Sequence, residues 1–321
     1  MTTLLDFPIK PEARPYLDAF AETPSEPQWL RAARRQGLDS FARQGFPGRR
    51  SENWRYLDLR ALEAHPLLPA VMDQPMGIPS GLALAGDGPR LVLVDGRFAP
   101  GLSRLAAAPG VWFGTMRQAI AERPELVQAM TVAADQPFAA LNAAFFAEGF
   151  VLDLAPGAVF ERPIEIVHLA SGAADASLHT RNVVSLGRGS RATNLETFAG
   201  PRADDANYWR NDVAAWRLDD GAALTRIALV EEGAGAVHLG EVAATLGAGA
   251  KLDAFVLLLG GGTVRHAASV TLAGAGASCR IDGAFVVAGQ EEANIVTAID
   301  HAAVGGTTTE LVKGVAAGRG H

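Results

Sequence analysis

In the first part of the chain, apolar residues recur with the 3.6-residue period of an α-helix. The clearest stretch predicts a helix over residues 26–44, with Ser25 and Gln28 forming a capping box at its start. Gly45 and Pro47 follow this stretch and are expected to end the helix. The pattern therefore predicts that the chain begins with a small helical region.

Two further short helices are predicted over residues 115–130 and 137–147. Between residues 66 and 89, proline and glycine are frequent among small residues, which indicates a connector. We therefore expect a helical N-terminal region with its connector over residues 1–85, followed by a mixed transition segment over residues 86–149.

From residue 150 onward the apolar period changes to two. Residues 268–272 and 278–282 alternate small or apolar residues with polar ones, and glycine-rich turns separate such segments. This alternation is typical of strands with one buried face. Residues 150–321 are therefore predicted to form a β core.

A repeated turn predicts the architecture of this core. Five units begin with a leucine and continue into a glycine-containing turn, at Leu154, Leu186, Leu218, Leu246 and Leu272. The leucines are 32, 32, 28 and 26 residues apart, which favours a parallel β-helix in which each coil stacks on the next. Such turns also suit the hairpins of an antiparallel sandwich, which is the alternative architecture.

Composition and charge narrow the class of protein. The chain has 321 residues, of which 49% are hydrophobic, and its net charge of −7 gives it no polycationic character. We therefore expect a sizeable core and no nucleic-acid or membrane partner. The apolar stretches are too short to span a bilayer and the N-terminus lacks the pattern of a secretion signal, so a cytoplasmic location is expected. The single cysteine fits a reducing compartment.

Several motifs of nucleotide-binding and hydrolytic enzymes do not occur in the sequence. It contains no G-x-x-x-x-G-K-[ST] loop, so the chain is not expected to bind or hydrolyse ATP. Neither G-x-S-x-G nor H-E-x-x-H occurs. We predict that the chain is not an enzyme, and no catalytic residue is assigned.

The histidines show no spacing typical of metal ligands. They stand at positions 65, 168, 179, 238, 266, 301 and 321. His168 is expected to pack within a strand or to take an exposed polar position, and Cys279 is expected to be a small core residue rather than a reactive thiol. No metal ligand is therefore predicted.

Residues 49–59, RRSENWRYLDL, are the most distinctive string in the chain. Residues 31–60 contain eight arginines against three acidic residues. One interpretation is a docking patch, because arginine and aromatic residues are enriched at interface hot spots. The favoured interpretation is a solvated helix end with Trp54, Tyr56 and Leu57 packed on the domain.

Residues 45–59 resemble the N-terminal motif of the SufD branch of the SufB/SufD family, in which a glycine-proline turn precedes a basic residue, a glutamate and a tryptophan. Residues 140–145, and residues 180–186 with Glu196 beyond them, follow in the expected order. The last matching residues are Asp300, His301, Thr308, Glu310, Leu311, Lys313 and Gly314.

The resemblance implies a mostly β chain, a right-handed parallel β-helix preceded by a small α-helical region. It also implies a non-catalytic scaffold subunit of iron–sulfur cluster assembly that acts with a SufB-type paralogue and a SufC-type ABC ATPase. A conventional cluster needs four thiolates and the chain has one cysteine, so none is expected on the isolated chain. A cluster is expected to be handled only transiently, within the complex.

Family members continue past the segment that matches Lys313 and Gly314, with further coils and a helical region that binds the ATPase. The interface histidine and cysteine credited with function belong to that part, so no cofactor-binding residue is carried over. Residues 314–321 contain three glycines and little apolar bulk, and they are not expected to cap the last coil. We therefore expect a homodimer that forms through this coil.

Two other functions stay open. β-Helices also host carbohydrate-active enzymes, although the repeated turns here show no recurring acidic position. A self-associating structural solenoid is the remaining alternative.

Overall fold

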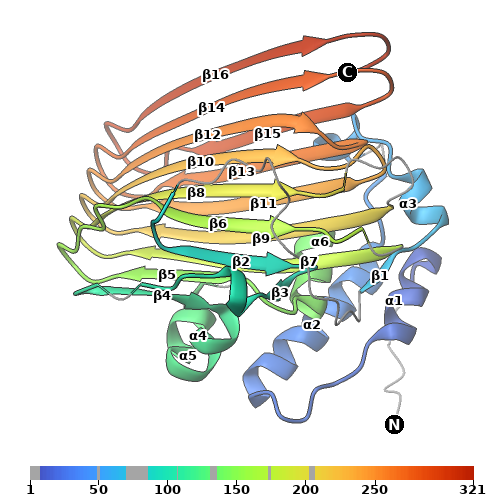
Figure 1. Cartoon of the computed structure of the whole chain (residues 1–321), viewed down its shortest axis with the longest axis horizontal. Helices are drawn as coiled ribbons and strands as arrows, with labels where there is room; N and C mark the ends of the chain where they lie inside the picture. Colours follow the sequence, from blue (N-terminus) through green and yellow to red (C-terminus); the bar gives the residue numbers. More distant parts are fainter. Residues whose placement is uncertain are drawn as a thin grey trace.

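The computed structural model describes residues 8–48, 51–69, 86–106, 108–130, 136–172, 175–201 and 207–321. The fold is mostly β, with 45% of the described residues in strands and 21% in helices. The strands wind into a β-solenoid of about five turns with parallel sheets, and a few helices gather beside its N-terminal coils (Figure 1).

The helical elements come mainly from the first half of the chain. They are η1 (Pro11–Ala13), α1 (Arg14–Ala19), α2 (Gln28–Gln44), η2 (Glu52–Trp54), α3 (Arg60–Ala64), η3 (Pro100–Leu102), α4 (Met116–Glu122), α5 (Pro124–Ala129) and α6 (Pro137–Phe145). No helix in the described ranges is long and apolar enough to cross a membrane.

The strands belong to two sheets that face each other across the core. The first sheet contains β1 (Leu68–Pro69), β4 (Val111–Thr115), β5 (Phe150–Leu154), β7 (Ala176–Leu186), β9 (Tyr208–Leu218), β11 (Val237–Leu246), β13 (Thr263–Leu272) and β15 (Glu292–Asp300). The second sheet contains β2 (Arg90–Val94), β3 (Arg97–Phe98), β6 (Ile164–Leu169), β8 (Arg191–Ala199), β10 (Ala223–Glu231), β12 (Lys251–Gly260), β14 (Ser278–Val287) and β16 (Thr307–Ala316). The chain passes from one sheet to the other in each coil, so neighbouring strands in a sheet come from successive coils (Figure 1).

The repeated leucines stack directly on one another. In the parallel register of the first sheet, Leu154 pairs with Leu186, Leu186 with Leu218, Leu218 with Leu246, and Leu246 with Leu272. Each leucine is buried in one core cluster with the leucines of its neighbours. The predicted solenoid is confirmed, and the antiparallel sandwich is wrong.

The turn after each leucine explains the repeated glycines. Gly189, Gly221, Gly249 and Gly276 have φ between 63° and 71°, a conformation that only glycine adopts without strain. The N–H of each of these glycines donates to a carbonyl in the turn of the next coil, at 2.8–3.0 Å. The turns therefore continue the coil-to-coil hydrogen bonding of the two sheets.

The helical region packs on the outer face of the first sheet. α6 lies against β7 and β9, and α2 packs on α6 at a close approach, since a Cβ at Gly37 would lie 2.6 Å from the carbonyl oxygen of Ala140 (Figure 1). Tyr16, Phe138 and Trp209 join helices and sheet in one aromatic cluster. Both faces of these strands are therefore covered.

Helix ends differ from the sequence prediction at two places. α2 begins at Gln28 with Pro27 as its N-cap and no side-chain cap, so the predicted capping box of Ser25 and Gln28 is wrong. A proline disfavours the helical conformation in the residue before it, so the helix cannot begin ahead of Pro27. A capping box does occur where none was predicted, at Thr115 before α4.

The predicted helix over residues 115–130 is in fact two helices, α4 and α5. Arg123, which precedes Pro124, has φ −140° and ψ 51° and interrupts the helical conformation between them. The helix predicted over residues 137–147 is present as α6 and ends at Phe145.

The transition segment contributes strands to both sheets. β2 pairs with β6 in parallel and β4 pairs with β5 in antiparallel orientation, so these strands extend the solenoid at its N-terminal end. Most of the predicted connector, residues 70–85, lies outside the described residues. The boundaries of the three predicted regions stay a prediction.

Candidate functional site

Charged and polar side chains fill part of the solenoid interior. This interior polar cluster consists of His168, Thr180, Asn182, Glu196, Arg210, Asp212, Arg226, Glu232, His238 and His266, all of them buried. Buried charges are costly unless they are paired and hydrogen-bonded. The cluster is therefore the part of the described chain whose chemistry most needs an explanation.

Strand alternation and register bring these residues together. In β9, Arg210 and Asp212 share the inward face with Leu218 because successive side chains point to opposite faces. Arg210 pairs with His238 in the ladder, and Asp212 pairs with the glycine two residues beyond it on β11. Sequence-distant residues thus meet only because the coils stack in this register.

The first buried ion pair joins Arg210 and Glu232. Arg210 Nε donates to Glu232 Oε1 at 2.6 Å, and Tyr208 Oη donates to Glu232 Oε2 at 2.5 Å. His238 Nδ1 lies 3.0 Å from Glu232 Oε1. Burial alone would raise the pKa of the Glu232 carboxyl, but Arg210 and His238 hold this pKa well below its usual range. Glu232 is therefore ionised and shared by three donors.

The second buried ion pair joins Arg226 and Glu196. Arg226 Nε donates to Glu196 Oε2 at 2.9 Å, and Arg226 Nη1 lies 3.2 Å from His266 Nε2. Burial, with the charge of Arg226 adding to it, lowers the pKa of His266 well below its usual value. The ring of His266 is therefore neutral, and its Nε2 accepts from the guanidinium.

Asp212 lies between the two ion pairs. Thr180 Oγ1 donates to its Oδ1, and Asn182 Nδ2 donates to the same oxygen at 2.8 Å. Burial raises the pKa of this carboxyl, and the charge of Glu196 adds to the effect.

His168 is a buried residue of strand β6, and this is one of the two environments predicted for it. Its ring stacks on Phe198 at a centroid distance of 4.4 Å. Burial, together with the charge of Arg210, lowers the pKa of His168 well below its usual value. Neither ring nitrogen has a hydrogen-bond partner among the described residues.

A second polar layer joins α6 to the outer face of the first sheet. Asn142 Nδ2 donates to the carbonyl oxygens of Thr180 and Asn211, and Arg181 Nε donates to Asn142 Oδ1 at 3.0 Å. Burial lowers the pKa of His179, in the same layer, to about 3. These contacts satisfy buried polar groups and fix the helix on the sheet.

The arginine-rich segment is only partly packed. Trp54 and Leu57 are buried, and the Arg265 guanidinium lies 4.0 Å from the centre of the Trp54 ring. Tyr56 is 63% exposed, so its predicted packing on the domain is wrong. Arg49 and Arg50 lie outside the described residues.

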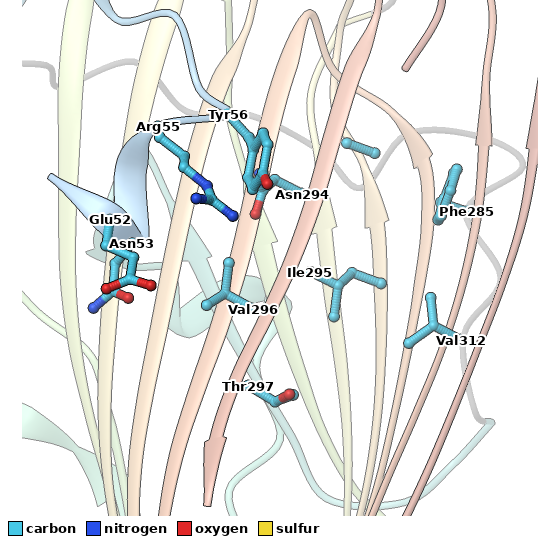
Figure 2. Close-up of a pocket in the computed structure, with 11 residues that line it drawn as sticks. Glu52, Asn53, Arg55, Tyr56, Phe285, Asn294, Ile295, Val296, Thr297 and Val312 are labelled. Carbon is cyan, nitrogen blue, oxygen red and sulfur yellow. The ribbon is translucent and has the colours of Figure 1, made fainter. Parts of the chain in front are cut away.

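A groove of about 470 Å³ opens beside this segment. Arg55 and Tyr56 stand on one side of it, and Ile295, Phe285 and Val312 supply apolar surface from the last coils (Figure 2). A polar rim beside apolar surface suits a protein segment better than a small substrate. The predicted docking patch therefore stays a prediction, with this groove as its candidate surface.

The predicted small core role of Cys279 agrees with its surroundings. Cys279 is buried in the main core cluster, and burial raises the pKa of its thiol to about 12, with the carboxylates of Glu310 and Asp253 adding to the effect. His301 is exposed, and its Nε2 lies 2.9 Å from Thr308 Oγ1. Within the described ranges, no group of three or more His, Cys, Asp or Glu residues could hold a metal ion.

The interior polar cluster was missed by the sequence analysis. One signal was present, because Arg210, Asp212 and Leu218 are separated by even numbers of residues and so lie on the same face of a strand. The pairing with Glu232 had no local signal, because it depends on the turn that follows β10 and on coil register.

Comparisons with known proteins agree on one family. The family described as SUF system FeS cluster assembly, SufBD core domain, matches residues 168–321. The chain is also 27% identical over 271 residues to the iron-sulfur cluster assembly protein SufD of Escherichia coli (strain K12). The aligned region covers 83% of this chain and 62% of that relative.

Proposed function

Because the chain belongs to the SufB/SufD family and resembles SufD, we propose that it is a non-catalytic scaffold subunit of iron–sulfur cluster assembly. The single observation that carries the proposal is the match of residues 168–321 to the SufBD core domain. These residues form most of the solenoid coils, so the resemblance rests on the scaffold itself.

The interior chemistry supports a structural role. Glu196 and Glu232, which could otherwise serve as acids or bases, are each held by a buried arginine. A general base must reach the proton that it removes, and these carboxylates face the inside of the solenoid. A carbohydrate-active enzyme would instead need acidic residues along an accessible face.

The partners in this proposal are a SufB-type paralogue and a SufC-type ABC ATPase. The chain contributes one buried cysteine, so the thiolates of a nascent cluster come from the partner and the cluster is handled in the complex. A reducing, cytoplasmic compartment suits such thiolates. The homodimer expected from the sequence stays a prediction.

Co-purification tests the proposal. The chain carries an affinity tag and is expressed together with a SufB-type and a SufC-type protein of the same organism. We expect both partners to elute with it in fixed ratio, and ATP hydrolysis to require the SufC-type subunit. Elution of the tagged chain alone, at physiological salt, would contradict the proposal.

The groove beside Arg55 and Tyr56 can be tested in the same experiment. Tyr56→Ser removes an exposed aromatic side chain from the rim, whereas Leu105→Ser removes an exposed apolar side chain elsewhere. If the groove binds a partner, only Tyr56→Ser should weaken co-purification, because aromatic residues carry much of the binding energy at interfaces. Equal effects of both variants would remove the groove from consideration.

A further inference from the structure

The outer face of the second sheet is covered over only part of its length. Beside β6, Val94 and Leu102 of the segment from β2 to η3 pack on the cluster that contains Val167 and Leu169. From β10 onward this cover ends in the described part of the chain. Large apolar side chains on the face are there between 36% and 47% exposed, namely Ile227, Phe255, Leu259 and Val286.

The strand register joins these residues into one patch. Ile227 of β10 pairs with Phe255 of β12. Leu229 pairs with Leu257, which in turn pairs with Ala284 of β14. A parallel sheet normally has both faces covered, and the first sheet meets this rule because α6 and α2 lie on its outer face. An exposed apolar patch across several strands marks an interaction surface.

The size of this face suits a second sheet of the same kind. The strands β10, β12, β14 and β16 have 9–10 residues each. With neighbouring strands about 4.8 Å apart and a rise of about 3.3 Å per residue, they present a face of about 600 Å². Two such faces would bury about 1,200 Å², which is the lower limit for a specific interface. Sheets pack face to face in this way in many proteins, so the contact should be specific but concentration-dependent.

The charges at the two ends of the patch complement each other in a symmetric contact. Lys251 stands four residues before Phe255, and Glu231 stands four residues after Ile227, so all four side chains point to the outer face. A half-turn about an axis that crosses the strands at Ile227 and Phe255 brings Lys251 of one copy to the strand ends that carry Glu231 of the other. Opposite charges then meet twice, as a two-fold contact requires.

We propose that a second copy of this chain packs on this face with its strands antiparallel, so that Ile227 and Phe255 lie near the two-fold axis. A partner with charge of a single sign is disfavoured, because Lys251 and Glu231 give the patch both signs. Asp282, which lies inside the patch, is already paired with Arg280 at 2.7 Å. This contact differs from the homodimer expected from the sequence, which would form through the last coil.

Sedimentation velocity of the whole chain over a wide range of concentrations tests the contact. The unsubstituted chain should change from monomer to dimer as its concentration rises. Ile227→Lys places a charge at the two-fold axis and should keep the chain monomeric throughout. Val304→Lys is the matched control and should dimerise as before, because Val304 is exposed in the turn between β15 and β16, away from the sheet face. Loss of the dimer in Val304→Lys alone would assign the contact to the last coil and overturn the proposal.

A charge exchange tests the orientation of the two copies. Lys251 is exposed, so Lys251→Glu leaves the core unchanged. This substitution brings like charges together at both symmetric contacts and should weaken the dimer by about tenfold or more. Adding Glu231→Lys in the same chain restores opposite charges and should return the dissociation constant towards its original value. A strictly monomeric chain, or a double variant without recovery, would overturn the proposal, as would a face that binds only a SufB-type protein.

Discussion

The two ends of the solenoid interior are built from the same coils but with opposite chemistry. At the end where the glycine turns lie, Leu186, Leu218, Leu246 and Leu272 stack in a ladder of apolar side chains. At the opposite end of the same strands, the interior is polar: Arg210 of β9 pairs with His238 of β11 in the sheet, and both side chains are buried. Apolar contacts are non-directional, whereas each buried charge depends on one specific partner. A substitution at the leucine end should therefore lower the free energy of unfolding in proportion to the side-chain volume removed. A substitution at the polar end should lower it by an amount that depends on which charged partner is removed.

The largest effect is expected from Glu232→Gln, which removes the charge that neutralises Arg210 with little change in shape. Removing one partner of a buried ion pair costs about 3–5 kcal/mol, because the other charge remains buried without compensation. Denaturant unfolding at pH 7 measures the loss. Arg188→Ala is the control, since its ion pair with Asp220 is exposed and should contribute less than about 1 kcal/mol. Similar losses in both variants would show that the polar end does not depend on specific partners.

Leu246→Ala tests the leucine end and should cost about 2–5 kcal/mol through lost burial and a residual cavity. Leu311→Ala, at an exposed position on β16, is the matched control and should change the free energy of unfolding far less. The same denaturant experiment measures both. A small effect at Leu246 would mean that the ladder repacks around the loss.

The pH dependence of stability separates the two ends. Burial and the charge of Arg210 lower the pKa of His168 well below its ordinary value of 6.5, so the folded ring stays neutral where the unfolded ring takes a proton. The free energy of unfolding should therefore fall as the pH drops below about 6.5, by about 1.4 kcal/mol per pH unit for this residue.

His168→Phe keeps a ring that can stack on Phe198 and should remove that part of the slope. Val304→Phe, at an exposed position without a titratable group, is the control for an added aromatic ring and should leave the slope unchanged. Urea unfolding between pH 5 and pH 7 supplies the two slopes. Equal slopes in the two variants would contradict a neutral, buried His168.

The smallest effect is expected at Cys279, which lies among the apolar residues of the core. Burial raises the pKa of its thiol to about 12, so a thiol reagent at pH 8 should not modify the folded chain. Modification should appear only in denaturant, while an exposed reference thiol introduced by Ser51→Cys should react at once. Cys279→Ala should cost about 1 kcal/mol, and rapid native labelling would contradict the assigned burial.

The leucine end could be predicted from the sequence because its repeat is both local and regular. Leu218, Leu246 and Leu272 each precede a glycine turn, so their spacing gives coil length directly. The polar end could not be predicted in this way. In β9 the outward Trp209 is as buried as the inward Arg210, because α6 and its neighbours cover the outer face. Where both faces of a strand are covered, alternation no longer tells inside from outside.

The candidate groove could also be predicted only in part from the sequence. The burial of Trp54 follows from its apolar ring, but the exposure of Tyr56 depends on where the last coils end relative to the segment. The start of α2 was misplaced for a simpler reason, since the effect of Pro27 on the preceding residue outweighs the capping tendency of Ser25.

The stacked glycine turns have a mechanical consequence. Successive coils are joined side by side through hydrogen bonds that run along the solenoid axis, in the two sheets and again in the turns. A force along that axis therefore loads a few bonds of one coil at a time, and the coils should peel away singly under tension. Each event frees one coil of 26–32 residues, or roughly 90–110 Å of extended chain. The coils that contain β7 and β9 carry α6 on their outer face and should be the last to yield.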